Sequence, residues 1–129
     1  MTEGFTREEL EEALRAVASM ILRTEKSKAK FAQGTPQYTL QRNRLAALHI
    51  ASSLIAKELR KDSLTNDYTK EDLEKAVAPI ASLVSKSEKA QKKLAPGTWQ
   101  HTMLENNLKA LNIASALITK VLNGTEGMF

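Results

Sequence analysis

The chain has 129 residues, of which 42% are hydrophobic and 26% charged, and these proportions fit one soluble globular domain. It contains no cysteine, which excludes disulfides and thiolate metal sites, and it has no apolar run long enough to cross a bilayer. We therefore expect a cytoplasmic protein with no membrane segment. The net charge of +4 is too small by itself to indicate nucleic-acid binding.

The first predicted element is an amphipathic helix that begins after Thr6 and is expected to end at Gly34. Thr6 and Glu9 have the spacing of a capping box, and a glycine suits the left-handed residue that follows many helices. Its apolar residues recur at helical spacing, at Leu10, Leu14, Val17 and Ile21.

A second amphipathic helix is predicted to start directly after Gly34, with Thr35 as its N-cap and Pro36 at its first position. Its apolar stripe includes Leu45, Leu48, Ile55 and Leu59. Because the intervening turn is short, these two helices should form an antiparallel hairpin.

The second half of the chain repeats the first. The segment FTREELEEAL at Phe5 recurs as YTKEDLEKAV at Tyr68, and LAALHIASSLIAK at Leu45 recurs as LKALNIASALITK at Leu108, both 63 residues later. About half of the aligned positions are identical, and no gap is needed. We therefore predict an all-α, up-down-up-down four-helix bundle made of two tandem repeats of an antiparallel helical hairpin.

The predicted organisation is a single domain over residues 1–129. Repeat one covers residues 5–61, the linker 62–67 and repeat two 68–124, and a frayed tail at 125–129 follows a glycine stop at Gly124. A lone hairpin cannot bury its apolar stripe, so the two repeats should pack together.

No recognisable catalytic or metal-binding pattern occurs in these helices. Neither His49 nor His101 has the preceding glutamate of a Glu-x-x-His motif, and the chain lacks a nucleophile elbow and a phosphate-binding glycine loop. We expect no enzymatic activity, no cofactor and no metal. Glu25 and Glu88 are instead predicted to hydrogen-bond across their hairpins to Asn43 and Asn106.

The charges are distributed unevenly along the predicted bundle. Residues 23–44 carry a net charge of +5 and residues 86–107 a net charge of +2, which leaves −3 for the rest of the chain. Up-down-up-down order would bring both segments to one end, together with two helix N-termini that favour anions. The candidate residues for binding a partner or an anion at this end are Lys26, Lys30, Thr35, Tyr38, Arg42, Arg44, Lys89, Lys93, Thr98 and Trp99.

Three functions remain open from the sequence. The leading hypothesis is a small non-enzymatic helical module that binds a protein partner through the turn end or an exposed helical face. The second is a nucleic-acid- or anion-binding protein that uses the basic turn end. The third is a small-ligand carrier or enzyme with a site between helices, beside the proline expected to kink the third helix, Pro79. The repeat also leaves a homodimer open.

Overall fold

The protein is an all-α four-helix bundle of two antiparallel hairpins. The computed structural model describes residues 4–61 and 68–127, and within them it contains four helices and no strand. Helices α1 (Arg7–Ala29) and α2 (Pro36–Arg60) form hairpin one; α3 (Lys70–Lys92) and α4 (Trp99–Gly127) form hairpin two. The predicted linker, 62–67, lies outside the described residues.

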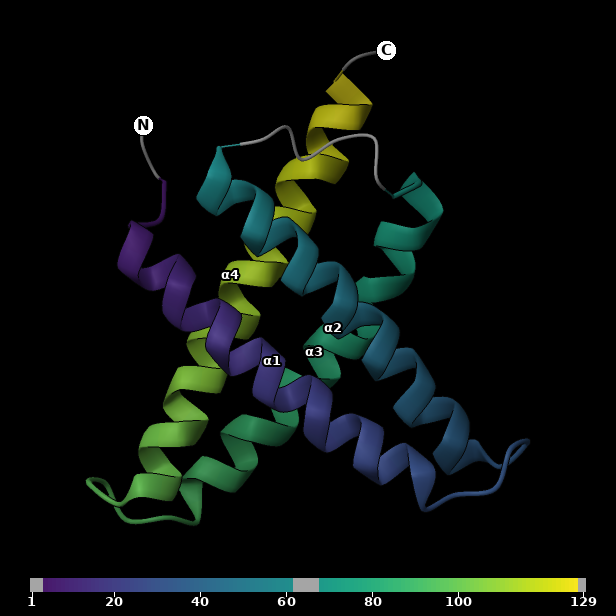
Figure 1. The fold of residues 1–129 in the computed structure, drawn as a ribbon, viewed down its shortest axis with the longest axis vertical. Helices are drawn as coiled ribbons and strands as arrows, with labels where there is room; N and C mark the ends of the chain where they lie inside the picture. Colours follow the sequence, from purple (N-terminus) through teal and green to yellow (C-terminus); the bar gives the residue numbers. More distant parts are fainter. Residues whose placement is uncertain (1–3, 62–67, 128–129) are drawn as a thin grey trace.

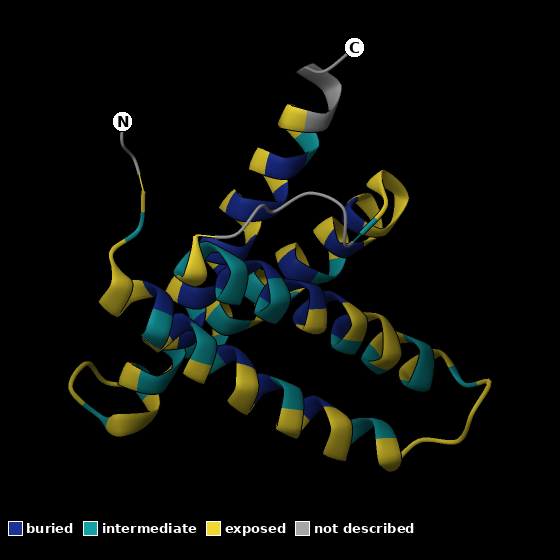
Figure 2. Cartoon of the chain, turned by 45° about the horizontal axis from the view of Figure 1, so that its top comes forward, coloured by how far each residue is buried: buried dark blue, intermediate teal, exposed yellow. Residues whose placement is uncertain are grey.

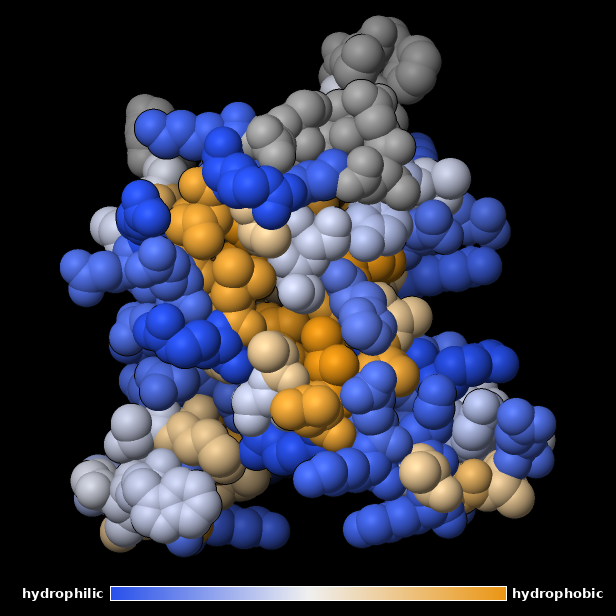
Figure 3. Space-filling model, in the orientation of Figure 1, coloured by the Kyte–Doolittle hydropathy of each residue, from blue (hydrophilic) through white to orange (hydrophobic). Residues whose placement is uncertain are grey.

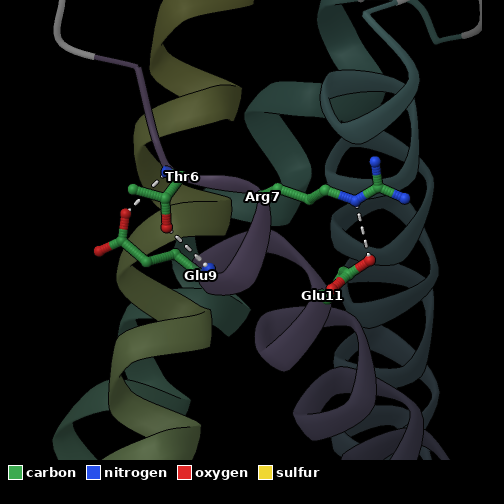
Figure 4. A network of polar contacts seen from close by, with 4 residues as sticks. All are labelled: Thr6, Arg7, Glu9 and Glu11. Carbon is green, nitrogen blue, oxygen red and sulfur yellow. Dashed lines mark hydrogen bonds and ion pairs between the residues drawn. The ribbon is translucent and has the colours of Figure 1, made fainter.

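Side chains at the helix starts provide local reasons for the chain to become helical there. In α1 the Glu9 amide donates to Thr6 Oγ1 over 3.0 Å, and the Thr6 amide donates to Glu9 Oε1 over 2.8 Å (Figure 4). Thr69 and Asp72 make the same reciprocal pair at the start of α3. One turn of α1 is further supported by the exposed Arg7–Glu11 ion pair, at 3.2 Å.

The turns are longer than the sequence indicated, because α1 ends at Ala29 and not beside Gly34. After Ala29 the amides of Lys30 and Phe31 bond to carbonyls only three residues back, which tightens and closes the last turn. Gly34 lies within the turn at φ 89°, a left-handed conformation that glycine adopts without strain. Gly97 has φ 92° in the other hairpin.

The predicted glycine stop near the C-terminus is also wrong, since α4 continues past Gly124 to Gly127. A glycine inside a helix costs about 1 kcal/mol relative to alanine but does not forbid the helical conformation. The last two residues of the predicted tail, 128 and 129, lie outside the described residues. α3 runs through Pro79 as one helix, and the kink expected there stays a prediction.

The two hairpins cross one another and do not lie parallel. α1 packs against α2 and α4, α3 packs against the same two helices, and α2 contacts α4, whereas α1 and α3 do not touch within the described chain. Figure 1 shows both turns on the same side of the molecule, at its two lower corners, with the crossing above them. The hairpins therefore diverge toward their turns.

The core lies at the crossing and draws on all four helices. Buried residues occupy the inner faces of the helices, whereas the turns are exposed (Figure 2). Within this core, all residues except Met20 and Val121 have a buried counterpart 63 positions away. The core residues are Leu10, Ala13, Val17, Met20, Ala47, Leu48, Ile50, Ala51, Leu54, Ile55, Leu73, Ala76, Ile80, Ala110, Leu111, Ile113, Ala114, Leu117, Ile118 and Val121.

Candidate functional site

The crossing divides the expected basic end into two separate turn corners. The first corner carries five of the candidate residues and the second carries four (Figure 1). Residues of the first corner are Lys26, Lys30, Thr35, Tyr38 and Arg42, and those of the second are Lys89, Lys93, Thr98 and Trp99. The tenth candidate, Arg44, belongs to neither corner because its side chain is buried between the hairpins.

At each corner the capping threonine is already engaged with the backbone. Thr35 Oγ1 accepts from the Tyr38 amide at 3.1 Å and donates to the Ala32 carbonyl at 2.7 Å. Thr98 makes the equivalent pair of bonds with His101 and Ala95. These bonds cap both helices, so no ligand is needed to explain why the helices start at these residues.

The aromatic side chains give the corners different surfaces. In the first corner the Lys28 ammonium lies 5.8 Å from the centroid of the Tyr38 ring, a cation–π contact. In the second corner Trp99 is 71% exposed and is the most exposed of the large apolar side chains that the structure describes.

A pocket of about 290 Å³ lies between the two hairpins, on the turn side of the core. All four helices contribute to it, and none of its lining residues carries a negative charge. Figure 3 shows a notch between the two turn corners, on the side where these helix segments diverge. The lining residues are Met20, Arg23, Thr24, Ser27, Gln41, Arg44, Leu83, Lys86, Ser87, Ala90, Leu104 and Asn107.

Arg44 is the most unusual residue of this pocket. It is 8% exposed, and no acidic side chain pairs with it within the described chain. Its Nη2 donates to Ser82 Oγ on α3 over 3.2 Å, while its Nε is buried with no hydrogen-bond partner. Desolvation by burial lowers the pKa of Arg44 from its ordinary value, but an arginine starts so far above neutral pH that it stays protonated. Arg44 is therefore a buried cation whose charge no described residue neutralises.

Two further cations line the same pocket from opposite hairpins. Arg23 of α1 and Lys86 of α3 occupy equivalent positions, 63 residues apart, and both are exposed. Arg23 Nη1 approaches Met103 Sδ of α4 at 3.3 Å, a weak polar contact that reaches across to hairpin two. With Arg44, the pocket gathers three positive charges.

Uncharged polar groups complete the lining. Asn107 of α4 is 6% exposed and places its side-chain amide in the lining. Ser27, Ser87 and Gln41 add hydroxyl and amide donors. Three cations together with uncharged donors make a setting suited to a negatively charged oxygen ligand.

Two other hollows differ from this pocket in charge. A groove of about 650 Å³ between α2 and α3 contains Pro79, where the sequence suggested a site between helices, but its Lys75 is accompanied by Asp72. The hollow between α1 and α4 similarly contains both Glu12 and Arg15. Unlike these two hollows, the pocket between the hairpins is lined by cations without a carboxylate.

Sequence reasoning selected one of the three pocket cations, Arg44, and missed the roles of Arg23 and Lys86. Both belong to the positively charged segments 23–44 and 86–107, yet nothing in the helical pattern shows that they line one pocket. The internal repeat was the one signal in the sequence that bears on this pocket. All twelve lining residues form six pairs spaced by 63 positions, which is what a pocket shared equally by two similar hairpins produces.

Comparison with other proteins adds no function to this geometry. No family model, no curated protein and no solved structure matches the chain. Among the residues the structure describes, no group of three or more His, Asp or Glu is placed to hold a metal ion. Within 4–61 and 68–127, no helix combines the length and apolarity needed to span a bilayer.

Proposed function

We propose that this protein is a non-enzymatic binding module that takes up a small anionic ligand in the pocket between its two hairpins. The observation that carries the proposal is the buried Arg44 guanidinium, which has one hydroxyl partner, an unpaired Nε and no carboxylate. Burying an uncompensated charge costs several kcal/mol, on the order of the whole stability margin of many small domains. An anion in the pocket would offset that cost and would also attract Arg23 and Lys86.

The proposal is tested by isothermal titration calorimetry with inorganic phosphate at low ionic strength. The wild type is expected to bind one phosphate, and Arg44→Gln is expected to weaken binding at least tenfold, because hydrogen bonds to charged groups contribute about 1.5–3 kcal/mol. Arg15→Gln is the matched control, since Arg15 is an exposed arginine of α1 outside this pocket.

Two outcomes would contradict the pocket as the site. One is the absence of any anion binding. The other is binding that survives Arg44→Gln but is lost when Lys89 and Lys93 are both changed to Glu, which would return the site to a turn corner and to the nucleic-acid alternative.

A protein partner is the second candidate function, and a different surface favours it. An apolar strip crosses the face on which α1 lies in front (Figure 3). On α1, Leu22 is 60% exposed, Ala18 is exposed and Ile21 is half-buried, at helical spacing. Apolar surface of this kind, bordered by polar residues, is typical of a contact with another protein.

The matched variant for this second candidate is Leu22→Ser, because hairpin two has Ser85 at the corresponding position. We expect it to leave folding intact and to remove self-association or partner binding in analytical ultracentrifugation. Unchanged association in the variant would remove this face from consideration.

A further inference from the structure

The size of the pocket distinguishes among anions. At about 290 Å³ it lies close to the lower end of the range for small-molecule sites. Inorganic phosphate, with one phosphorus and four oxygens, would fill only part of that space. The remaining volume has room for an organic substituent.

The charge of the pocket favours a dianion over a monoanion. Arg23, Arg44 and Lys86 supply three positive charges, and the lining has no acidic residue. A phosphate monoester carries about −1.5 to −2 at neutral pH and offers three acceptor oxygens. A carboxylate, with a single negative charge, would leave more of the positive charge uncompensated.

The two hairpins differ in how polar a wall they contribute. Hairpin one places Ser27 and Gln41 in the pocket, where hairpin two has Ala90 and Leu104 at the corresponding positions. Leu83 of α3 adds to the apolar wall on the second side. An apolar group on the ligand would gain from contact with this wall, whereas a bare anion would leave it exposed to water.

We infer that the ligand is a small organic phosphate monoester, with its phosphate among Arg23, Arg44 and Lys86 and its apolar substituent against Ala90, Leu83 and Leu104. This inference rests on the proposed anion site and adds the chemical class of the ligand. Arg23 and Arg44 belong to hairpin one and Lys86 to hairpin two, so a phosphate bound among them would also tie the hairpins together.

The experiment compares four probes by isothermal titration calorimetry on the full chain: phenyl phosphate, inorganic phosphate, benzoate and phenol. Phenyl phosphate is expected to bind at least tenfold more tightly than inorganic phosphate, since even one buried methylene changes affinity about tenfold or more. Benzoate should bind more weakly than phenyl phosphate because it has a single charge. Phenol should not bind measurably.

The variant Leu104→Gln replaces an apolar residue of this wall with glutamine, which is the residue that hairpin one has at the corresponding position, Gln41. It is expected to reduce phenyl phosphate affinity several-fold and to leave inorganic phosphate affinity unchanged. Ala81→Ser, an exposed site on α3 outside the pocket, is the control and should change neither affinity.

The outcomes separate the two proposals. Equal affinities for phenyl phosphate and inorganic phosphate, with no effect of Leu104→Gln, would overturn the ligand class and leave the anion site standing. Benzoate binding as tightly as phenyl phosphate would overturn the choice of a phosphate. Phenol binding as tightly as phenyl phosphate, or no binding of any anion, would overturn the anion site itself.

Discussion

Arg44 is the residue on which the proposed anion site depends. Its guanidinium lies under α3 with one hydroxyl partner, at a depth where arginine is normally paired with a carboxylate. Arg42, two residues earlier in α2, is exposed. Hairpin two places the neutral Asn107 at the position that corresponds to Arg44, so the scaffold itself does not need a cation there.

At the residue scale, Arg44→Met should therefore stabilise the free protein. Methionine keeps much of the side-chain volume and removes the buried charge, so we expect the free energy of unfolding to rise by about 1 kcal/mol. Urea denaturation with and without phosphate would measure the free energy of unfolding of both proteins. Phosphate should stabilise only the wild type. A loss of several kcal/mol in the variant would instead show that Arg44 serves the structure.

The starts of the helices could be predicted from neighbouring residues in the sequence, whereas the end of α1 could not. Thr6, Thr69 and Thr35 each cap a helix through a bond to an amide three residues away, which is a property of neighbouring residues. The end of α1 at Ala29 depends on a tightened last turn that no residue type marks. The predicted hydrogen bonds of Glu25 to Asn43 and of Glu88 to Asn106 are not formed among the described residues, and all four side chains are exposed. Glu25 is one residue beyond the buried Thr24, and one residue turns a helix by about 100°.

At the element scale, two glycines should respond oppositely to replacement by alanine. Gly34→Ala should cost about 1 kcal/mol, because Gly34 has φ 89° and its surroundings leave room for a methyl group, so only backbone strain contributes. Gly124→Ala should stabilise by about 0.5–1 kcal/mol, because Gly124 lies inside α4 with no nearby atom to clash. Thermal denaturation of the two variants measures both effects. A stabilising Gly34→Ala would contradict the turn geometry.

The arrangement of the whole molecule determines where the site lies. The repeat and the helical periodicity were sufficient to predict four helices in two hairpins. The angle at which the hairpins cross depends on how the side chains of α1 to α4 interlock, which is a property of packing between distant segments. That angle separates the two turn corners and brings Arg23 and Lys86 to a shared pocket, so the pocket required the tertiary structure (Figure 1).

At the scale of the whole molecule, the shared core predicts one cooperative unfolding transition. Leu54 of α2 and Leu117 of α4 are corresponding residues, 0% and 2% exposed, and each replaced by alanine should cost about 2–5 kcal/mol. Circular dichroism reports all four helices, whereas fluorescence of Trp99 reports hairpin two. Leu54→Ala should shift both signals equally. A shift in circular dichroism alone would mean that the hairpins unfold independently.

The most direct test of the anion site is a crystal structure grown with a heavy-atom oxyanion such as tungstate, located by anomalous scattering. We predict that the strongest anomalous peak lies between the hairpins, within contact distance of Arg23, Arg44 and Lys86, and that it is absent from crystals of Arg44→Met. Peaks confined to the turn corners at Thr35 and Thr98, or an equally strong peak in the variant, would contradict the account.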